Sequence, residues 1–268
     1  MKKISYIYAW LFGRPAFTKI NNFIFALALR GLGIYNYTNS KLSGEKWLIK
    51  NIVKKLGDEL IIFDIGANVG GYTKELILEG VDAKKIFAFE PHPITYSKLQ
   101  TSVLPFPQVV PVNVALSGQY GEMTLFDRSD GDGTPHASLS AEIFSEIHQV
   151  GRNSTTVRTE TLDGFCAQNK INTIDFVKID VEGFELNVLE GAKGMLSGGK
   201  IKLIQFEFTQ LNAVVGVFFK QLYDILSPDY DIYRLLPHGL RKIEKYDPTI
   251  CEIYGYQNFA AIFRRDVD

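Results

Sequence analysis

A glycine-rich turn that opens with a carboxylate is the first segment whose residue types suit ligand chemistry. It reads Asp64-Ile65-Gly66-Ala67-Asn68-Val69-Gly70-Gly71. Gly66 and Gly70 would let the backbone approach a ligand closely, where a side chain would collide. The alternative is a dinucleotide-binding GxGxxG turn, but its second glycine, which admits a pyrophosphate, is Asn68 here. Since Asp64 would also repel a phosphate and suit an ammonium group, the turn favours a ligand without phosphate.

Glu90 is the second candidate, because it stands before Pro91 at the expected end of the next strand. A carboxylate about 20 positions after a glycine turn can accept hydrogen bonds from both hydroxyls of a ribose. The alternative for Glu90 is a solvated loop carboxylate. Its spacing from the glycine turn favours the ribose contact, so the two segments together predict a nucleoside site.

Acidic residues are concentrated in a later segment, Lys178-Ile179-Asp180-Val181-Glu182-Gly183-Phe184-Glu185. Asp180 and Glu182 are interpreted as direct members of the site. Glu185 suits the first turn of a following helix, where the helix dipole favours an anion. Lys178 is interpreted as the cation that neutralises this acidic turn.

Glu207 extends the acidic group to a further apolar run, Gln205-Phe206-Glu207-Phe208. Alternation along a strand gives Gln205 and Glu207 the same orientation. If the two runs form neighbouring strands, Glu207 is expected to lie close to Asp180.

Four histidines offer further proton-transfer groups. His136 lies in a glycine-rich segment and could reach over a bound substrate; the alternative is an exposed loop residue. His238 follows a proline and precedes a glycine, which is typical of a turn. His92 and His148 are interpreted as structural.

Short apolar runs alternate with segments of helical spacing along the chain. Helices are predicted at 43–56, 73–78 and 94–101, and strands at 60–65, 85–89, 109–115, 174–179 and 202–208. Continuously apolar strands separated by helices predict a parallel sheet covered on both faces. Such sheets bind ligands at the carboxyl ends of their strands, which is where the candidate residues stand.

A long stretch at 117–172 separates the third and fourth runs. It reads as irregular apart from two expected strands, 123–127 and 155–161. Loops of this length are uncommon unless they are functional, so an insertion that shapes or covers a pocket is predicted. Further along, a helix at 218–226 and late strands at 230–236 and 259–263 are expected.

Length and composition fit one α/β domain of ordinary globular type, with 46% hydrophobic and 22% charged residues. A net charge of -1 does not provide the positive field that duplex nucleic acid binding usually requires. Cys166 and Cys251 are far apart and lack the spacing of metal ligands, which argues against a zinc site or a disulfide framework. A cytoplasmic protein is expected.

Residues 1–41 are predicted to form an N-terminal extension of one or two amphipathic helices, and residues 42–268 the α/β domain. The apolar run at 4–12 is not followed by a small-residue cleavage site, which argues against a signal peptide. The run at 22–31 is shorter than the ~20 apolar residues that a spanning helix needs. Packing on a face of the domain is the first interpretation. The alternative is that residues 1–35 dock on a membrane, at its inner face, or on a partner.

Taken in order, these motifs resemble the FkbM family of methyltransferases. The matching segments are FDIGANVGGYTKEL (63–76), FEPHP (89–93), NVALSG (113–118), ASL (137–139), TLDGF (161–165), DFVKIDVEGFELNVLEGA (175–192) and QFEF (205–208). The similarity spans roughly residues 42 to 265. DIGANVG is shared by many methyltransferases, whereas IDVEGFE in this position is much more discriminating.

The resemblance implies an S-adenosylmethionine-dependent O-methyltransferase on a Rossmann-like sheet, mostly parallel with an antiparallel edge. The cofactor residues it implies are Asp64, Gly66, Asn68 and Gly70 for the methionine part, Glu90 for the ribose, and Asn113 with Ala115 for the adenine. Family members are described as acting on hydroxyls of natural products, sugars or lipid-linked glycans. The expected partner is therefore a small-molecule or glycan acceptor.

Methyl transfer to a neutral alcohol requires an acceptor oxygen held in line with the methyl carbon, and a group that takes its proton. Asp180 is the first candidate for that base or for an orienting residue, and it also stands among the expected cofactor contacts. Glu182, Glu207 and His136 are further catalytic candidates. A less favoured interpretation has Asp180 and Glu207, with Glu182, hold a divalent ion that lowers the pKa of the hydroxyl.

Two other classes of protein stay open at this point. A partner subunit could retain the nucleoside pocket without turnover, although intact acidic residues at the strand ends argue against it. A nicotinamide-dependent oxidoreductase is the other class, and Asn68 is the feature against it.

Overall fold

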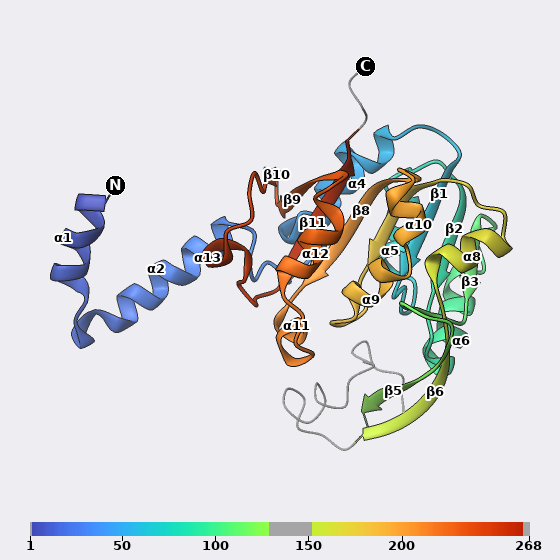
Figure 1. The fold of residues 1–268 in the computed structure, drawn as a ribbon, viewed down its shortest axis with the longest axis horizontal. Helices are drawn as coiled ribbons and strands as arrows, with labels where there is room; N and C mark the ends of the chain where they lie inside the picture. Colours follow the sequence, from blue (N-terminus) through green and yellow to red (C-terminus); the bar gives the residue numbers. More distant parts are fainter. Residues whose placement is uncertain (1, 129–151, 265–268) are drawn as a thin grey trace.

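A single large sheet forms the centre of the computed structural model, which describes residues 2–128 and 152–264. Its strands are β1 (Leu60–Ile65), β2 (Ala83–Phe89), β3 (Val109–Val112), β7 (Ile174–Ile179), β8 (Ile201–Phe208), β9 (Tyr230–Leu236), β10 (Gly239–Lys242) and β11 (Gln257–Phe263). They lie in the order β10-β9-β11-β8-β7-β1-β2-β3 (Figure 1). The five strands from β8 to β3 are parallel, and β11, β9 and β10 add an antiparallel edge. The predicted fold class is confirmed.

Helices cover both faces of this sheet. One face carries α4 (Glu45–Asn51), the short helix η2 (Val53–Lys55), α5 (Gly71–Leu78) and α6 (Pro93–Val103). The other carries α8 (Leu162–Gln168), α9 (Glu185–Glu190), α10 (Lys193–Ser197) and α12 (Phe219–Leu226). Three short helices complete the domain: α3 (Ser40–Ser43), α11 (Gln210–Val214) and α13 (Pro248–Cys251).

Strand alternation divides the buried side chains between two cores. In β1, Phe63 and Ile65 pack under α8 and α9, whereas Ile62 packs under α4 and α5. Asp64 lies on the same face of the sheet as Ile62. Lys178 of β7 and Glu207 of β8 also lie on this face, because their neighbours Val177 and Phe206 point to the other one. The polar residues of three neighbouring strands therefore meet on the α4 and α5 side of the sheet.

The insertion forms a second, smaller sheet. Its strands are β4 (Ala115–Leu116), β5 (Gly121–Arg128) and β6 (Arg152–Glu160), in the order β4-β6-β5. The two strands expected in this stretch are confirmed, but α8 was not foreseen; Thr161 caps it by accepting a hydrogen bond from Gly164 N. The expected strand at 109–115 is wrong in its end. The strand stops at Val112, because the chain turns at Asn113 toward the second sheet. Ala115 is already part of that second sheet.

The N-terminal residues form helices α1 (Lys2–Phe12) and α2 (Thr18–Gly31), joined by the short helix η1 (Pro15–Phe17). These helices extend away from the domain (Figure 1). The interpretation that they pack on a face of the domain is therefore wrong: Trp10 is 74% exposed and Phe23 62%, and burial begins only at Leu29. Within the described residues, every helix is too short or too polar to cross a membrane.

Candidate active site

The turn between β1 and α5 is shaped by close packing at its glycines. Gly66 has φ +83°, and a Cβ there would lie 1.8 Å from the carbonyl oxygen of Asp180. Gly70 has φ +82°, and a Cβ there would lie 3.0 Å from the side chains of Leu99 and Val103. The two glycines therefore make room for β7 and α6, and not for a ligand as expected. Gly66 nevertheless lines a pocket, whereas Gly70 is not among its lining residues.

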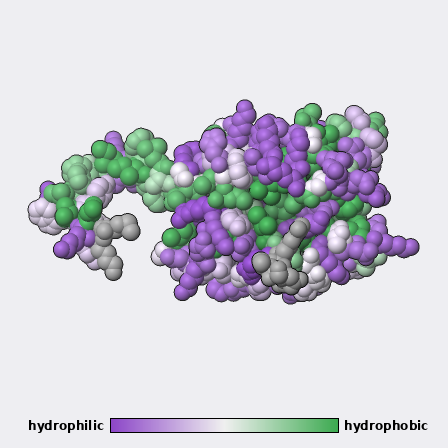
Figure 2. Space-filling view, turned by 90° about the horizontal axis from the view of Figure 1, so that it is seen from above, coloured by the Kyte–Doolittle hydropathy of each residue, from purple (hydrophilic) through white to green (hydrophobic). Residues whose placement is uncertain are grey.

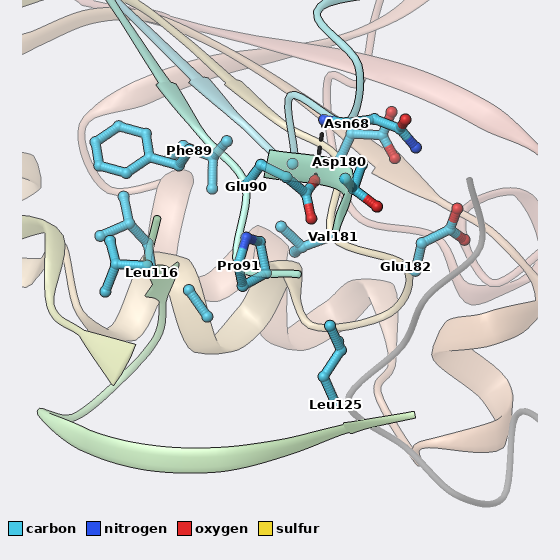
Figure 3. Close-up of a pocket in the computed structure, with 14 residues that line it drawn as sticks. Asn68, Phe89, Glu90, Pro91, Leu116, Leu125, Asp180, Val181 and Glu182 are labelled. Carbon is cyan, nitrogen blue, oxygen red and sulfur yellow. Dashed lines mark hydrogen bonds between the residues drawn. The ribbon is translucent and has the colours of Figure 1, made fainter. Parts of the chain in front are cut away.

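Asn68 connects this turn to Glu90. Asn68 adopts φ 51°, a left-handed conformation that asparagine tolerates better than most residues, and its side chain accepts a hydrogen bond from Val69 N at 2.7 Å. Its backbone N–H donates to Glu90 Oε2 at 3.1 Å (Figure 3). The backbone of Asn68 thus helps to orient the carboxylate that was expected to bind a ribose.

Glu90 is buried at the tip of β2, one residue beyond the strand. Its Oε1 accepts a hydrogen bond from His92 N at 2.9 Å, so each carboxylate oxygen is held by a backbone N–H. Asn113 donates from Nδ2 to the carbonyl oxygens of Glu90 and Pro91, both at 2.9 Å. Asn113 therefore supports the loop that carries Glu90 and is not among the residues that line the pocket.

The pocket lies where β1, β2 and β7 end, and the second sheet closes it. Its lining residues are Ile65, Gly66, Asn68, Phe89, Glu90, Pro91, Thr95, Val114, Ala115, Leu116, Leu125, Asp180, Val181 and Glu182. In Figure 3, Leu125 reaches up from β5 toward the loops that carry Pro91 and Val181. One wall is therefore apolar, and the carboxyl groups of Glu90, Asp180 and Glu182 lie on the other side. The contribution of Leu125 was missed, although its place in the expected strand at 123–127 was a signal for it.

Asp64 is fully buried and lies outside the pocket lining. Its Oδ2 accepts a hydrogen bond from the hydroxyl of Thr73 at 2.6 Å, and Lys178 Nζ lies 3.9 Å from its Oδ1. Burial raises the pKa of Asp64, and the charge of Lys178 partly opposes that rise. The structure therefore places Asp64 behind the site, as a partner of Lys178.

Lys178 is buried beside the acidic turn, as expected. Its Nζ lies 2.9 Å from Asp180 Oδ2 and 4.8 Å from the centre of the Tyr72 ring. Burial favours the neutral amine, but the carboxylates of Asp180, Asp64 and Glu45 outweigh this effect and raise the pKa of Lys178 above its ordinary value. Asp180 thus contacts an ammonium group on one side and the pocket on the other.

Glu207 lies next to Asp180, as expected from the order of the strands. Strands β7 and β8 are paired, with Ile179 opposite Phe206. Burial raises the pKa of Glu207 well above its ordinary value, and the negative charges of Asp180 and Glu182 raise it further. The neighbouring carboxyl groups therefore differ: Asp180 is paired with a cation, and Glu207 is held in a setting that favours its protonated form.

A hydrogen-bonded group that sequence reasoning missed extends the site toward α4 and β11. Gln205 Nε2 donates to Glu45 Oε1 and to Asn258 Oδ1, each at 3.0 Å. Asn258 Nδ2 in turn donates to the hydroxyl oxygen of Tyr256 at 3.0 Å, and Tyr72 donates to Gln205 Oε1 at 2.6 Å. Glu45 stands apart from the acidic motifs in the sequence, and Tyr256 opens a late segment, YQNFAAIF (256–263), to which no role in the site was assigned.

Glu185 fixes the loop that carries Asp180 and Glu182. Its Oε1 accepts hydrogen bonds from Val181 N and Gly183 N, and its Oε2 from Asn212 Nδ2 at 2.8 Å. Glu185 opens α9, as expected, and burial raises its pKa to about 7. Glu182, in this loop, has φ 55° and lines the pocket.

The histidines contribute little to the described part of the site. His136 and His148 lie outside the described residues. His92 is buried, with its Nδ1 3.5 Å from Thr95 Oγ1, and His238 is exposed in the turn between β9 and β10.

The divalent-ion interpretation does not fit the described carboxylates. Within residues 2–128 and 152–264, no three His, Cys, Asp or Glu side chains are grouped so that they could hold a metal ion. Asp180, Glu182 and Glu207 all lie within these described ranges.

Comparison with known proteins identifies a family whose members are similar to this chain. Residues 64–235 match a family model described as the methyltransferase FkbM domain. The 2-O-methyltransferase NoeI of Sinorhizobium fredii is 28% identical over 67% of this chain and 76% of its own length. The hexuronic acid methyltransferase AglP of Haloferax volcanii is 26% identical over 69% of each chain. A crystal structure of methyltransferase FkbM from Methylobacillus flagellatus aligns with a TM-score of 0.48 and 16% identity, covering 76% of this chain and 44% of that one.

Proposed function

The chain belongs to the FkbM methyltransferase domain family, and from that premise we propose that it transfers the methyl group of S-adenosylmethionine to a hydroxyl oxygen of a sugar or glycan. The names of two relatives, a 2-O-methyltransferase and a hexuronic acid methyltransferase, support a sugar acceptor. The observation that carries the proposal is the Glu90 carboxylate, oriented by two backbone N–H groups at the edge of an apolar pocket. Asp180 and Glu207 stand beside that pocket.

The pocket fits the nucleoside of this cofactor. Phe89, Leu116 and Leu125 offer an apolar surface to an adenine, and the Glu90 carboxylate is suited to accept hydrogen bonds from ribose hydroxyls. When bound, S-adenosylmethionine supplies a methyl group on a positively charged sulfur. Asp180 and Glu182 place negative charge along the same wall, which favours a cationic ligand.

Asp180 and Glu207 take different roles in this proposal. The ion pair with Lys178 holds the Asp180 carboxylate in place at the edge of the pocket, which suits Asp180 to orient the acceptor hydroxyl. Burial raises the pKa of Glu207, with a further rise from the charges of Asp180 and Glu182, which makes its carboxylate a stronger proton acceptor than an ordinary glutamate. Glu207 therefore accepts the proton of the hydroxyl as its oxygen attacks in line with the methyl group.

The charges around Glu207 also bear on the acceptor. The carboxylates of Asp180 and Glu182 and the ammonium group of Lys178 all act on Glu207, so negative charge is in excess there even when Glu207 itself is protonated. A further negative charge would be repelled from this region. The acceptor ring is therefore neutral or positively charged near the methylated hydroxyl, unlike the hexuronic acid named for one relative.

Calorimetry with the purified chain tests the cofactor assignment. S-adenosylmethionine should bind and NAD should not, and Glu90→Gln should weaken binding by about 10- to 100-fold, since hydrogen bonds to a charged group are worth about 1.5–3 kcal/mol. Glu244→Gln, on an exposed carboxylate, is the matched control and should leave the affinity unchanged. Tight NAD binding without S-adenosylmethionine binding would mean a nicotinamide enzyme. Cofactor binding with no methyl transfer to any sugar would mean a partner subunit.

Transfer of labelled methyl groups to paired sugars tests the acceptor. A glucoside and the matching glucuronide differ only in the carboxylate, and kcat/KM should favour the neutral glucoside by about 10-fold or more at low salt. The preference should shrink as the salt concentration rises. A preference for the glucuronide would show that the described carboxylates do not face the acceptor.

A further inference from the structure

Residues 2–31, named here the N-terminal arm, have a defined shape although they extend away from the domain (Figure 1). The corner between α1 and α2 is held by side chains: Tyr8 donates to Asn21 Oδ1 at 2.6 Å, and Asn21 Nδ2 donates to the carbonyl of Phe12 at 2.9 Å. The ring of Phe12 also packs on those of Tyr8 and Phe17. The two helices are therefore held in one arrangement.

Residues 34–37, which follow the arm and are named here its root, are attached beside the site. Ile34 is fully buried, and Asn36 Nδ2 donates to the carbonyl of Arg30. Tyr35 N donates to the carbonyl of Tyr256 at 2.7 Å, and the ring of Tyr37 packs edge-on against that of Tyr256. The arm thus starts next to the tyrosine whose hydroxyl belongs to the polar group around Glu207.

Each helix of the arm presents an exposed apolar stripe. The stripes consist of Ile4, Ile7, Tyr8 and Leu11 on α1, and Ile20, Phe23, Ile24 and Leu27 on α2. All eight side chains are between 40% and 74% exposed, and Tyr6, Trp10 and Phe25, at other positions around the two helices, are between 62% and 74% exposed. Figure 2 shows hydrophobic residues over most of the arm. Contiguous exposed apolar surface of this kind marks a contact with a partner or a membrane.

The charge of the arm is of one sign. Residues 2–31 contain five Lys or Arg and no Asp or Glu, although the whole chain has a net charge of -1. Helices that combine exposed apolar and aromatic residues with basic residues bind in the interface of anionic membranes. With 11 and 14 residues, α1 and α2 are also shorter than the ~20 residues that a spanning helix needs.

We propose that the N-terminal arm docks on the surface of an anionic lipid bilayer. The apolar stripes of α1 and α2 enter the boundary between headgroups and acyl chains, and the basic side chains contact lipid phosphates. Because the root of the arm contacts Tyr256, docking turns the side of the domain that carries Tyr256 toward the bilayer. A membrane-anchored acceptor would then meet the site at the surface where it is held.

A second copy of the chain fits the arm less well. Pairing of two arms would bring together two sets of basic residues with no acidic residue between them. On the described part of the domain, the three most exposed apolar side chains, Leu78, Leu104 and Tyr120, belong to separate segments. They do not form a patch that would match the two stripes.

Vesicle binding by the full chain tests the proposal. The protein should sediment with vesicles of phosphatidylcholine and phosphatidylglycerol, and much less with phosphatidylcholine alone. Exchanging both Trp10 and Phe23 for serine should lower the partition coefficient by about 10-fold or more. The matched control exchanges Leu78 and Leu104 for serine. These leucines are 80% and 82% exposed on the domain, and the partition coefficient should stay within about twofold.

A spectroscopic measurement locates the contact. The chain has two tryptophans, so Trp47→Phe leaves Trp10 as the reporter, and its emission should shift to the blue when anionic vesicles are added. Equal sedimentation of the wild type and the Trp10 and Phe23 variant, or an unchanged emission, would overturn the proposal. So would a lipid-free dimer in ultracentrifugation that the same two exchanges convert to a monomer. Methyl transfer to a water-soluble sugar is measured separately, so the proposed function can stand or fail independently of the arm.

Discussion

Asp180 and Glu207 stand at the ends of neighbouring strands, yet their surroundings give the two carboxyl groups different chemistry. Lys178 lies 2.9 Å from Asp180 and stabilises its charge. Burial and the charges of Asp180 and Glu182 act on Glu207 in the opposite sense and raise its pKa. A carboxylate paired with an ammonium group is suited to orient the acceptor, and a carboxyl group with a raised pKa is suited to proton transfer.

The exchange Glu207→Gln tests this division of roles. It should lower kcat by about 100-fold or more, because general bases typically contribute about 10²–10⁴ in rate. The base acts only when deprotonated, so wild-type kcat/KM should rise with pH through the raised pKa of Glu207, and the variant should lose this rise. The affinity for S-adenosylmethionine should stay within about threefold. If Asp180→Asn abolishes the pH dependence and Glu207→Gln does not, Asp180 is the base.

Glu185 predicts a pH dependence of stability. Its pKa is raised from 4.5 to about 7 in the folded chain, so the folded state binds this proton more tightly than the unfolded chain does. The resulting stabilisation is complete below the unfolded pKa and is lost as the pH rises through about 7, up to about 3 kcal/mol. The difference in unfolding free energy between the wild type and Glu185→Gln should therefore fall between about pH 5 and about pH 8 in urea titrations. A difference that does not change with pH would contradict the burial of an ionisable Glu185.

The turn between β1 and α5 illustrates how an element constrains its glycines. Gly66 lies against the backbone of Asp180, and Gly71, at the start of α5, has open space around it. The two positions are close in sequence and differ completely in what a methyl group would meet. They form a matched pair for testing the packing of the turn.

Gly66→Ala should destabilise the chain by about 3 kcal/mol or more, because the new Cβ collides with a backbone carbonyl at a positive φ. Gly71→Ala should change the unfolding free energy by no more than about 1 kcal/mol. Urea unfolding of both variants measures the difference, and calorimetry should show that only Gly66→Ala weakens cofactor binding. Equal effects of the two exchanges would mean that β1 and β7 are not packed as described.

The insertion contributes side chains of its second sheet to the wall of the pocket. Strand β5 pairs with β6 along its whole length, and Leu125 of β5 lines the pocket together with Leu116 of β4. The second sheet therefore completes the apolar wall that the large sheet leaves open on one side.

In the whole molecule, residues on the N-terminal side of the expected boundary are buried with the domain. Residue 41 was the expected end of the extension, but Ile34 is fully buried and Asn36 is 6% exposed. The backbone pairing of Tyr35 with Tyr256 also ties this segment to the site. We propose that the domain begins near residue 32 and that the arm alone precedes it.

Two truncations test the boundary. A chain that lacks residues 1–28 should keep its Tm within about 3 °C, because those residues bury almost nothing. A chain that lacks residues 1–41 should lose about 5 to 10 °C, because removal of a buried Ile34 costs about 2–5 kcal/mol. Calorimetric melting of both forms provides the measurement, and equal Tm values would restore the boundary at residue 41.

Residue order along the chain was sufficient to predict the parallel sheet and the placement of its motifs. Strand periods and turn residues are local signals, and parallel strands bring their carboxyl ends to one edge. The proximity of Glu207 to Asp180 and the position of Glu90 beyond β2 follow from that rule. The family resemblance could also be recognised from the motif wording alone.

Folding in three dimensions was needed for contacts between segments that are distant in the chain. Glu45 and Tyr256 reach the site from α4 and from the residues before β11, and no periodic pattern relates them to the motifs. Asp64 faces Lys178 because alternate side chains of β1 point to opposite faces of the sheet. The direction of the N-terminal arm depends on whether the domain offers a matching apolar surface. Whether two surfaces match is decided by how the domain packs. The spacing of residues within one helix gives no information about it.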